Sequence, residues 1–301
     1  MPARPRRAVA PPARPAATAN GGTLFVVATP IGNLGDVTLR SLEVMRSVPL
    51  IAAEDTRISK RLLTRYDIGT KMTSFHARSG PARLTELLEH LRGGADLALV
   101  TDAGTPVVSD PGGELVAAWA GEGGLVVPIP GASAVLAAVA ASGIAGPRWG
   151  FEGFLPRSGR ERRERVARLA TDDRATVLFE APTRLAATLR DLAAACGPER
   201  AAAVCRELTK LHEQIIRGTL AELGAAVADG TIPARGEVAI VIAGQVPDEA
   251  AKPDDRPPIA DARARVAGLV RDGTSRTDAA RQVAAETGHS RRDLYREAGS
   301  G

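Results

Sequence analysis

The chain carries at residues 96–113 the sequence DLALVTDAGTPVVSDPGG, which joins a predicted strand to a predicted helix. We expect the buried strand over residues 96–100 and the helix over 114–119, because a short apolar run is followed by small, turn-forming and acidic residues. Gly104 and Gly112 let the backbone come close to a ligand, while Pro106 and Pro111 stiffen the path between them. One loop of this kind is as typical of an ordinary strand-to-helix connection as of a binding loop.

Three further loops follow apolar, β-branched runs in the same way. They are PIGNLGD (30–36) after residues 24–29, EDTR (54–57) after residues 49–53, and PGAS (130–133) after residues 125–129. Two of them lead into expected helices, over 38–46 and 134–141. Strands that alternate with helices form parallel sheets, in which ligands bind beyond the carboxyl ends of the strands. The sequence therefore predicts an α/β domain with one cluster of small-molecule binding loops at one edge of its sheet.

A chain of 301 residues has room for two domains, each with a sizeable core. Its hydrophobic content of 44% and mean hydropathy of -0.05 are typical of a soluble globular protein, and no apolar run approaches the length that spans a bilayer. Residues 1–20 contain arginines but no apolar signal segment, which predicts a disordered basic extension over 1–22. The absence of a spanning run predicts no membrane contact. Cys196 and Cys205 lack partners at metal-ligand spacing, so we expect no disulfide framework, no metal site and a reducing, cytoplasmic location.

Arginine dominates the basic residues of the chain. The net charge is +4, and all but four of the 39 basic residues are arginine. A bias in base composition explains most of this excess, since alanine, glycine and proline are also abundant. The six arginines from Arg157 to Arg168 are harder to explain in this way, because only Glu161 and Glu164 offset them locally. Arginine forms bidentate contacts to phosphate, so the cluster points to a nucleic-acid partner.

The chain divides into several segments after the basic extension. Residues 23–146 form the α/β domain with the binding loops, and residues 147–246 form a second α/β domain. In that second domain we expect strands over 175–180, 201–206, 213–217 and 237–243, and helices over 160–170, 182–195 and 219–228. A linker rich in proline and aspartate, over 247–258, precedes a tail over 259–301.

The tail has the apolar pattern of three short helices. Its turns at 273–275 and 288–290 each supply a Ser or Thr as a helix N-cap, which predicts a helix-turn-helix-like module. A packing appendage and a nucleic-acid contact are equally compatible with this module, because acidic residues nearly balance its arginines.

Several short motifs follow one another along the chain. The first half holds TPIGNLGD (29–36), EDTR (54–57), DAGTP (102–106), SDPG (109–112) and PGAS (130–133), and the second half holds GFLP (153–156), FEAPTR (179–184), RELTK (206–210) and GE (236–237). This ordered set resembles the ribosomal small-subunit methyltransferase I family, and the tail resembles that family's C-terminal helical module. The resemblance runs from about residue 23 to the end, and it is the set that is specific, since no single motif is.

The resemblance implies a tetrapyrrole-methylase-like (class III) methyltransferase fold, with two α/β/α domains, S-adenosylmethionine in the cleft between them, and usually a homodimer. It further implies methyl transfer to the ribose 2'-hydroxyl of a cytidine in the decoding region of 16S ribosomal RNA, within the 30S subunit. The chain departs from the family at two places. The family has a His-Glu-His-Asn-like run where this chain has His76-Ala77-Arg78-Ser79, and it commonly has His where Thr183 stands, so a universal catalytic role for that imidazole is untenable.

We expect the cofactor to lie against three of the four loops and one aromatic residue of the second half. The chain has neither a GxGxxG motif after a strand nor a P-loop motif, so no Rossmann-type or P-loop site is indicated. The expected cofactor-binding residues are Pro30, Ile31, Gly32, Asp102, Ala103, Gly104, Thr105, Pro106, Ser109, Pro130, Gly131, Ala132, Ser133 and Phe179.

Methyl transfer to a hydroxyl is an in-line displacement, so the protein mainly has to orient donor and acceptor. A general base would help, because a ribose hydroxyl is weakly acidic. The polar residues beside strands that could serve are Asp55, Asp110, Glu207, Lys210 and His212, of which we select Glu207, Lys210 and Asp55 as catalytic candidates. For each of them a salt bridge or a helix cap is the commoner role. For Lys210 we favour positioning, since an ordinary lysine is protonated at neutral pH.

The expected RNA-binding residues are arginines: Arg57, Arg157, Arg160, Arg162, Arg163, Arg184 and Arg206. For Arg57 and Arg206 a structural ion pair is an equal expectation. Two other functions are compatible with the sequence, namely a tetrapyrrole- or diphthine-type methyltransferase of the same fold and a non-enzymatic RNA-binding protein. The arginine cluster and the tail favour RNA over a macrocycle, and the four loops favour an enzyme.

Overall fold

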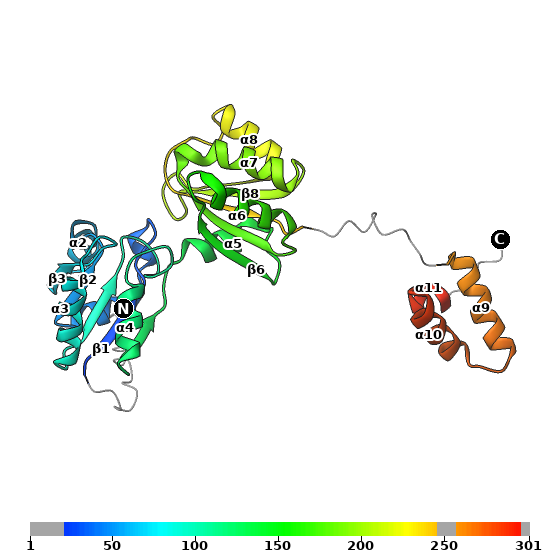
Figure 1. The fold of residues 1–301 in the computed structure, drawn as a ribbon, viewed down its shortest axis with the longest axis horizontal. Helices are drawn as coiled ribbons and strands as arrows, with labels where there is room; N and C mark the ends of the chain where they lie inside the picture. Colours follow the sequence, from blue (N-terminus) through cyan, green and yellow to red (C-terminus); the bar gives the residue numbers. More distant parts are fainter. Residues whose placement is uncertain (1–20, 246–256, 296–301) are drawn as a thin grey trace, which may run out of the picture. The chain divides into compact units, whose positions relative to one another are not determined.

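The computed structural model describes residues 21–245 and 257–295 (Figure 1). They belong to two compact units, which meet in the sequence between Gln245 and Val246. The first unit holds two α/β halves, each with its own five-stranded sheet, and the second is a small helical module. Residues 1–20 of the expected basic extension and 247–256 of the expected linker lie outside the described residues.

The first half contains a fully parallel sheet, with strand order β3-β2-β4-β1-β5. Its strands are β1 (Thr23–Val27), β2 (Leu50–Ala53), β3 (Lys71–Ser74), β4 (Leu97–Val100) and β5 (Leu125–Ile129). All four residues of β4 are buried, as expected for a parallel strand that is covered on both faces. The four strands that precede the predicted loops are confirmed. β3 was not predicted, because its sequence KMTS is mostly polar, as suits a strand at the edge of the sheet.

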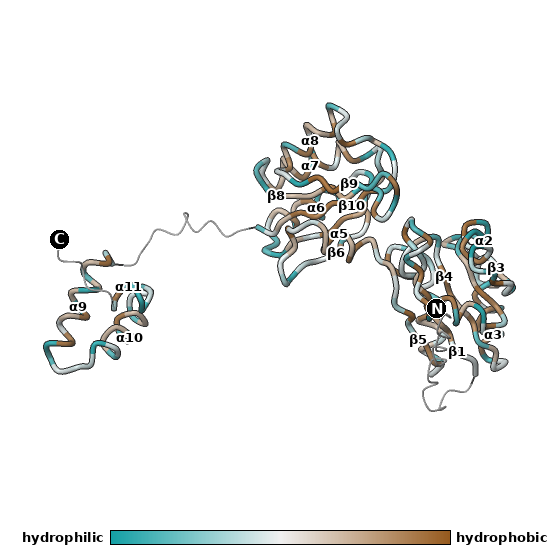
Figure 2. The backbone as a smooth tube through the Cα atoms, turned by 180° about the vertical axis from the view of Figure 1, so that it is seen from behind, coloured by the Kyte–Doolittle hydropathy of each residue, from teal (hydrophilic) through white to brown (hydrophobic). Residues whose placement is uncertain are grey.

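Helices cover both faces of this sheet. They are α1 (Leu39–Ser47), α2 (Thr56–Arg65), α3 (Pro81–Arg92) and α4 (Gly113–Gly121), with a short 3-10 helix η1 (Leu34–Asp36) before α1. Alternation along β1 places Leu24 in one apolar cluster with α3 and α4, and Phe25 in another with α1 and α2. Figure 2 shows the hydrophobic segments running through the central strands.

The second half has a mixed sheet, with strand order β6-β7-β10-β8-β9, in which only β6 and β7 pair in parallel. Its strands are β6 (Trp149–Phe154), β7 (Ala175–Glu180), β8 (Ala201–Arg206), β9 (Gln214–Thr219) and β10 (Val238–Ile242). The four strands expected here are confirmed within two residues at each end. β6 was not expected, because two glycines interrupt its apolar pattern.

One face of the second sheet packs against three helices, α6 (Gly159–Thr171), α7 (Leu185–Cys196) and α8 (Leu220–Ala228), with a 3-10 helix η2 (Pro182–Arg184) before α7. The opposite face packs against α5 (Ala134–Ser142). This helix is AVLAAVAAS, which is apolar on almost every side. Although α5 follows β5 of the first sheet in sequence, it belongs to the core of the second sheet, and it therefore fastens the two halves together.

The helical module consists of α9 (Ile259–Arg271), α10 (Arg276–Thr287) and α11 (Arg291–Tyr295). Its own apolar core is made of Ala262, Val266, Ala279, Ala280, Val283 and Leu294. The Ser275 side chain accepts a hydrogen bond from the Asp278 amide, and the Ser290 side chain accepts one from the Arg292 amide. The three expected helices and their serine caps are therefore confirmed. Among the described residues no helix is both long enough and apolar enough to cross a membrane.

Candidate active site

The four predicted loops meet at one edge of the first sheet. Because β1, β2, β4 and β5 are parallel, their carboxyl ends all point to this edge. The loop after β1 is paired with the loop after β4, since the Thr29 amide donates to the Gly104 carbonyl at 2.8 Å and the Gly104 amide donates back at 3.0 Å. The Thr29 hydroxyl also donates to the Thr101 carbonyl at 3.0 Å. The predicted loop cluster is thus confirmed.

Carboxylates hold the loop after β2 against the loop after β4. The Asp55 amide donates to Asp102 Oδ1 at 3.0 Å, and the Asp102 amide donates to Glu54 Oε2 at 3.2 Å. Burial raises the pKa of both Glu54 and Asp102. This exchange fixes the spacing of the two loops.

A cavity of about 390 Å³ opens beside these loops and is walled by both halves. The first half contributes Ile31, residues 103–105 and 108–110 of the β4 loop and the start of α5. The second half contributes Phe154, Phe179, Cys205, Leu208 and residues 236–239, among others. Its volume lies in the range of small-molecule sites. The walls are mainly apolar, and the carboxylates of Asp110, Glu180 and Glu237 are the acidic groups among them.

The structure distributes the expected cofactor residues over this cavity and two adjoining hollows. Those that line the cavity are Ile31, Ala103, Gly104, Thr105, Ser109, Ser133 and Phe179. A hollow of about 310 Å³ is lined by Pro30, Gly32 and Asp102, and one of about 560 Å³ by Pro130, Gly131 and Ala132; Ile31 borders all three spaces. Pro106 is buried and lines none of them, so it is a support of the loop rather than a contact residue.

Two glycines are needed for close approach. Gly104 has φ +81°, a left-handed conformation that strains any L side chain, and it lies in the cavity wall. Gly32 lies under the side chain of Lys210, because a Cβ at Gly32 would stand 2.4 Å from Lys210 Cγ. A side chain at position 32 would therefore push Lys210 away from the first half.

Strained backbone borders the cavity on both sides. In the β4 loop Val107 and Ser109 have φ values of 76° and 65°, and in the β8–β9 connection Glu207 and Thr209 have φ values of 52° and 67°. A β-branched residue in this region is rare, and each such residue costs about 1–3 kcal/mol. Strain of this kind gathers at functional sites, so it marks these two loops as parts of one site.

Lys210 is held between two carboxylates. Its Nζ donates to Glu207 Oε1 at 2.9 Å and lies 3.1 Å from Glu237 Oε2. Glu207 Oε1 also accepts the Glu237 amide at 2.8 Å, and these two interactions lower the pKa of Glu207. Burial acts to lower the pKa of Lys210, but the bonds to Glu207 and Glu237 outweigh it and raise that pKa. At neutral pH both partners are therefore charged, which suits positioning and does not suit proton abstraction.

Asp55 and Asp110, both candidate bases from the sequence, have different surroundings. Asp55 caps α2 through the Arg57 amide and pairs with the exposed Arg57 guanidinium at 2.6 Å, which lowers its pKa to about 2. A helix cap with so low a pKa is not a proton acceptor, so the expectation of a catalytic Asp55 is corrected. Asp110 lines the cavity, and burial together with the Glu54 carboxylate raises its pKa to about 6. Asp110 is the carboxyl that is suited to accept a proton near neutral pH.

Two of the expected RNA-binding arginines are buried structural residues. Arg162 donates to Asp191 at 2.8 Å, to Thr188 Oγ1 at 3.0 Å and to the Pro156 carbonyl. Arg206 is 4% exposed and donates to the Arg235 carbonyl at 2.7 Å. Their guanidinium groups are turned inward, so the expectation of an RNA contact is corrected for both.

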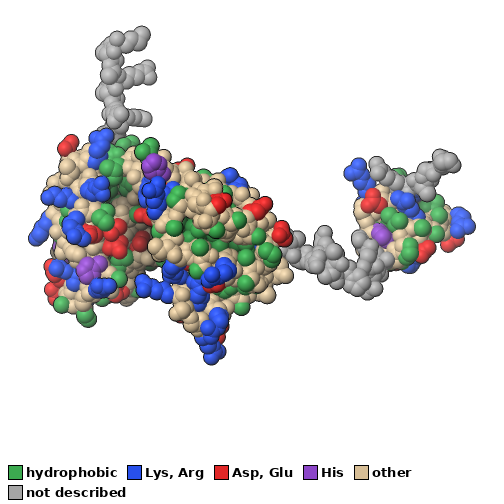
Figure 3. All heavy atoms as spheres, turned by 90° about the horizontal axis from the view of Figure 1, so that it is seen from above, with side chains coloured by type: hydrophobic (Ala, Val, Ile, Leu, Met, Phe, Trp, Pro, Cys, Tyr) green, Lys and Arg blue, Asp and Glu red, His purple; other side chains and the backbone are tan. Residues whose placement is uncertain are grey.

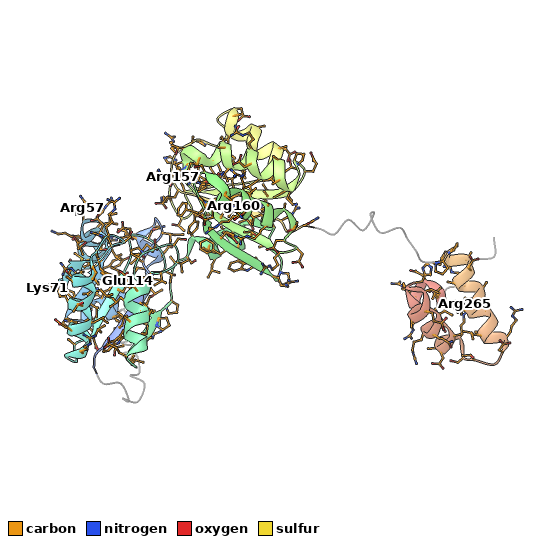
Figure 4. The ribbon with its side chains drawn as sticks, viewed as in Figure 1. Arg57, Lys71, Glu114, Arg157, Arg160 and Arg265 are labelled. Carbon is orange, nitrogen blue, oxygen red and sulfur yellow. The ribbon has the colours of Figure 1, made fainter. Side chains whose placement is uncertain are left out.

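The other expected arginines lie nearer to solvent. Arg184 pairs with Glu180 at 3.1 Å and is one-quarter exposed, while Arg160 is exposed and pairs with Glu164 at 2.5 Å. Arg157 and Arg163 are exposed, and neither side chain has a hydrogen bond or ion pair with another described residue. Figure 4 shows Arg57 on the first half and Arg157 and Arg160 on the second.

The list of expected site residues missed Phe154, Glu180, Cys205 and Glu237, which all border the cavity. Phe154, Glu180 and Glu237 stand in motifs that the sequence does show, GFLP, FEAPTR and GE. The sequence does not show that β10 pairs with β7 and β8, and this pairing brings the three motifs together. In the described part of the chain no group of three or more His, Cys, Asp or Glu side chains could hold a metal ion.

Comparison with known proteins gives a consistent result. The model of the family "Tetrapyrrole (Corrin/Porphyrin) Methylases" matches residues 23–224. The ribosomal RNA small subunit methyltransferase I of Synechocystis sp. is 48% identical over 277 residues, covering 91% of this chain and 96% of the relative. The protein of the same name from Bacillus subtilis is 38% identical over 274 residues, covering 91% of this chain and 93% of the relative.

Solved structures of lower identity share the fold. The cobalamin biosynthetic enzyme cobalt precorrin-4 methyltransferase superposes with a TM-score of 0.58 at 20% identity, covering 73% of this chain and 94% of that one. The uroporphyrin-III C-methyltransferase of Thermus thermophilus, complexed with S-adenosyl homocysteine, gives a TM-score of 0.55 at 18% identity, covering 74% of this chain and 97% of that one. The expected two-domain class III fold is thereby confirmed.

Proposed function

Since the chain belongs to the tetrapyrrole methylase family, and within it to the ribosomal RNA small subunit methyltransferases I, we propose that it transfers a methyl group from S-adenosylmethionine to ribosomal RNA of the small subunit. The observation that carries the proposal is the cavity walled by both halves, which gathers the strand-end loops, the strained backbone and the carboxyl of Asp110, whose pKa is raised to about 6. Each of these features suits a site that holds a cofactor beside an acceptor.

The walls of the cavity fit S-adenosylmethionine. The N-cap Ser133 and the first two residues of α5, Ala134 and Val135, line the cavity. The amides at a helix N-terminus favour an anion such as the carboxylate of the cofactor. The carboxylates of Asp110 and Glu237 favour its cationic groups. The apolar side chains of Ile31 and Phe179 provide surfaces for its uncharged parts. When bound, the cofactor would supply an electrophilic methyl group carried by its sulfonium sulfur. The acceptor oxygen takes this methyl group, and the sulfur is left as a neutral thioether.

The residues of the chain then have to orient the acceptor and accept its proton. We infer that Lys210 positions the RNA through its ammonium group, and that Glu207 positions Lys210. Asp110, in the cavity wall, takes the proton that the hydroxyl loses as the methyl–oxygen bond forms. This division leaves the charged pair intact throughout the reaction.

The finer part of the proposal concerns the acceptor and the assembly. The acceptor is the 2'-hydroxyl of a cytidine in the decoding region of 16S ribosomal RNA, presented in the 30S subunit, and the enzyme acts as a cytoplasmic homodimer.

Three measurements test the proposal. Undermethylated 30S particles are incubated with the protein and S-adenosylmethionine, and the methylated nucleotide is mapped by mass spectrometry; we expect one cytidine, modified on its ribose. Calorimetry with S-adenosylmethionine should show binding, and sedimentation should give twice the mass of the chain. Cofactor binding without transfer to 30S particles, but with transfer to a tetrapyrrole or to a diphthine precursor, would assign another acceptor.

A further inference from the structure

A groove on the second half adjoins the cofactor cavity. It has a volume of about 990 Å³ and is lined by the β6–α6 connection, by one side of α6 and by the start of α7. Phe154 and Ala181 line both the groove and the cavity, so the groove leads to the place where the methyl donor binds. A chain of nucleotides in the groove would present one of them at the cavity mouth.

Uncompensated positive charge lines this groove. Arg157, Arg163 and Arg190 are exposed, and none of their side chains has an ion pair or hydrogen bond with any residue in 21–245 or 257–295. The two other arginines of the groove, Arg162 and Arg184, are neutralised by Asp191 and Glu180. In Figure 3 basic side chains gather along one border of the second half.

An aromatic ring stands where the groove meets the cavity. Phe154 is 51% exposed, and its ring lies 5.6 Å from that of Phe179, centre to centre. Phe151 packs on the same Phe179 ring at 5.0 Å. Residues three apart on a regular strand point to opposite faces, so Phe151 and Phe154 share a face because β6 is irregular between them.

The irregularity is a β-bulge at Gly153. The pairing of β6 with β7 shifts between Phe151 and Gly153, and Gly153 has φ +65°. Bulges next to active sites redirect side chains, and here the bulge turns Phe154 toward the Phe179 side while half of its ring stays exposed. β6 thus presents the exposed half of the Phe154 ring to the groove.

We propose that this groove binds a single-stranded segment of the substrate RNA next to the acceptor nucleotide, with its phosphates on Arg157, Arg163 and Arg190 and one of its bases stacked on Phe154. The inference rests on the proposed function and names the subsite for the flanking nucleotides. Arginine side chains that follow a backbone, combined with an exposed aromatic ring, are typical of single-strand recognition. A duplex keeps its bases stacked on each other, so it leaves Phe154 without a partner.

The first test is a pair of matched single-charge variants on α6. Arg163 and Arg168 are both exposed, and neither side chain has a partner among the described residues, but only Arg163 lines the groove. Binding of a labelled single-stranded RNA of about 12 nucleotides is measured with the full chain at several salt concentrations. Arg163→Gln should weaken binding and reduce the log-log salt slope by about 0.7, and R157Q/R163Q/R190Q by about 2, whereas Arg168→Gln should match the wild type. Equal effects of Arg163→Gln and Arg168→Gln overturn the proposal.

The second test concerns the ring of Phe154. Phe154→Leu should weaken RNA binding about 5- to 150-fold, while Phe154→Tyr should retain it, because stacking needs an aromatic face. Phe154→Trp supplies a reporter whose fluorescence should be quenched by the single strand and not by a duplex of the same sequence. Leucine and tyrosine variants with the same affinity, or a duplex that binds as tightly as the single strand, show that Phe154 does not stack.

The two proposals fail in different ways. If the wild type methylates 30S particles and the triple arginine variant has the wild-type affinity and salt slope, the groove is wrong and the function stands. If the wild type methylates no ribosomal RNA, while the arginine variants still weaken and flatten single-strand binding, the proposed function is wrong and the groove stands. The cofactor affinity of each variant, measured by calorimetry, should equal that of the wild type for the three arginines.

Discussion

Lys210 is a residue of the second half whose side chain reaches the first half. Its side chain lies over Gly32 and its ammonium group is shared by Glu207 and Glu237. Because these carboxylates raise its pKa, Lys210 remains charged through the physiological range. An ammonium group so placed is suited to hold a phosphate or a ribose oxygen in position.

Replacing Lys210 by Met should therefore raise the concentration of 30S particles needed for half-maximal methylation, by about tenfold for a lost interaction of about 1.4 kcal/mol. The pH profile of the single-turnover rate at saturating 30S should stay unchanged. Lys71→Met, at an exposed position of β3 labelled in Figure 4, is the control and should behave as the wild type. A lower saturating rate with a shifted pH profile would instead make Lys210 the base.

Asp110 carries a prediction about pH. Its pKa is raised to about 6 from 3.8, so the folded protein holds its proton more firmly than the unfolded chain. The resulting penalty on folding is absent below pH 4, grows as pH rises to 6 and is complete above it. Two pKa units correspond to about 3 kcal/mol, which solvent screening of a half-buried group reduces to about 1–2 kcal/mol.

Asp110→Asn should remove this penalty. Urea unfolding should show the variant to be more stable than the wild type by about 1–2 kcal/mol at pH 7.5 and equal to it at pH 4. The same substitution should lower the single-turnover methylation rate, since an amide accepts no proton. A variant that keeps the wild-type rate at pH 7.5 would show that Asp110 is not the proton acceptor.

At the scale of elements, α6 combines two kinds of arginine. The helix packs Val166 and Leu169 into the core of the second half and buries Arg162 beside them. Arg162 ties α6 to Asp191 and Thr188 of α7 and to the carbonyl of Pro156. The neighbouring Arg163 faces the groove. A single step along the helix thus separates a structural arginine from one that lines the groove.

Arg162→Met should destabilise the protein by about 1–3 kcal/mol, because it removes the hydrogen bonds to Thr188 and to the Pro156 carbonyl, while water can still solvate the partly exposed Asp191. Arg163→Gln should change the free energy of unfolding by less than about 0.5 kcal/mol. Denaturant unfolding monitored by circular dichroism gives both values. Similar stabilities for the two variants would contradict the assignment of Arg162 as a structural residue.

At the scale of the whole molecule, the helical module has a core of its own, apart from the unit that ends at Gln245. A chain shortened to residues 1–245 should keep the cofactor affinity of the full protein, because every residue of the cavity lies before that point. Calorimetry with S-adenosylmethionine provides the measurement. A loss of affinity of more than about tenfold would mean that the module is part of the cofactor site.

The sequence alone determined eight of the ten strands, the four loops at one edge of the first sheet and the capped turns of the module. These features depend on neighbours in the chain: the apolar run 97–100 followed by Asp102, Gly104 and Pro106 can only end a buried strand in a turn. The apolar pattern is a weaker indication of α2, because its residues TRISKRLLTR are mostly polar. Its clearest local signal is Asp55, which caps the helix. The apolar pattern is weaker still for β6, which two glycines interrupt.

Only the tertiary structure decided which of these residues act together. Neighbouring arginines at 162 and 163 are equivalent in sequence, yet one is buried and the other exposed because α7 packs on one side of α6. Lys210 lies beside Glu237 because β8 pairs with β10. The helix α5 follows a strand of the first sheet but packs against the second sheet. Burial, charge pairing and pKa depend on atoms that are distant in the chain, and these distances are set when the sheets and helices pack.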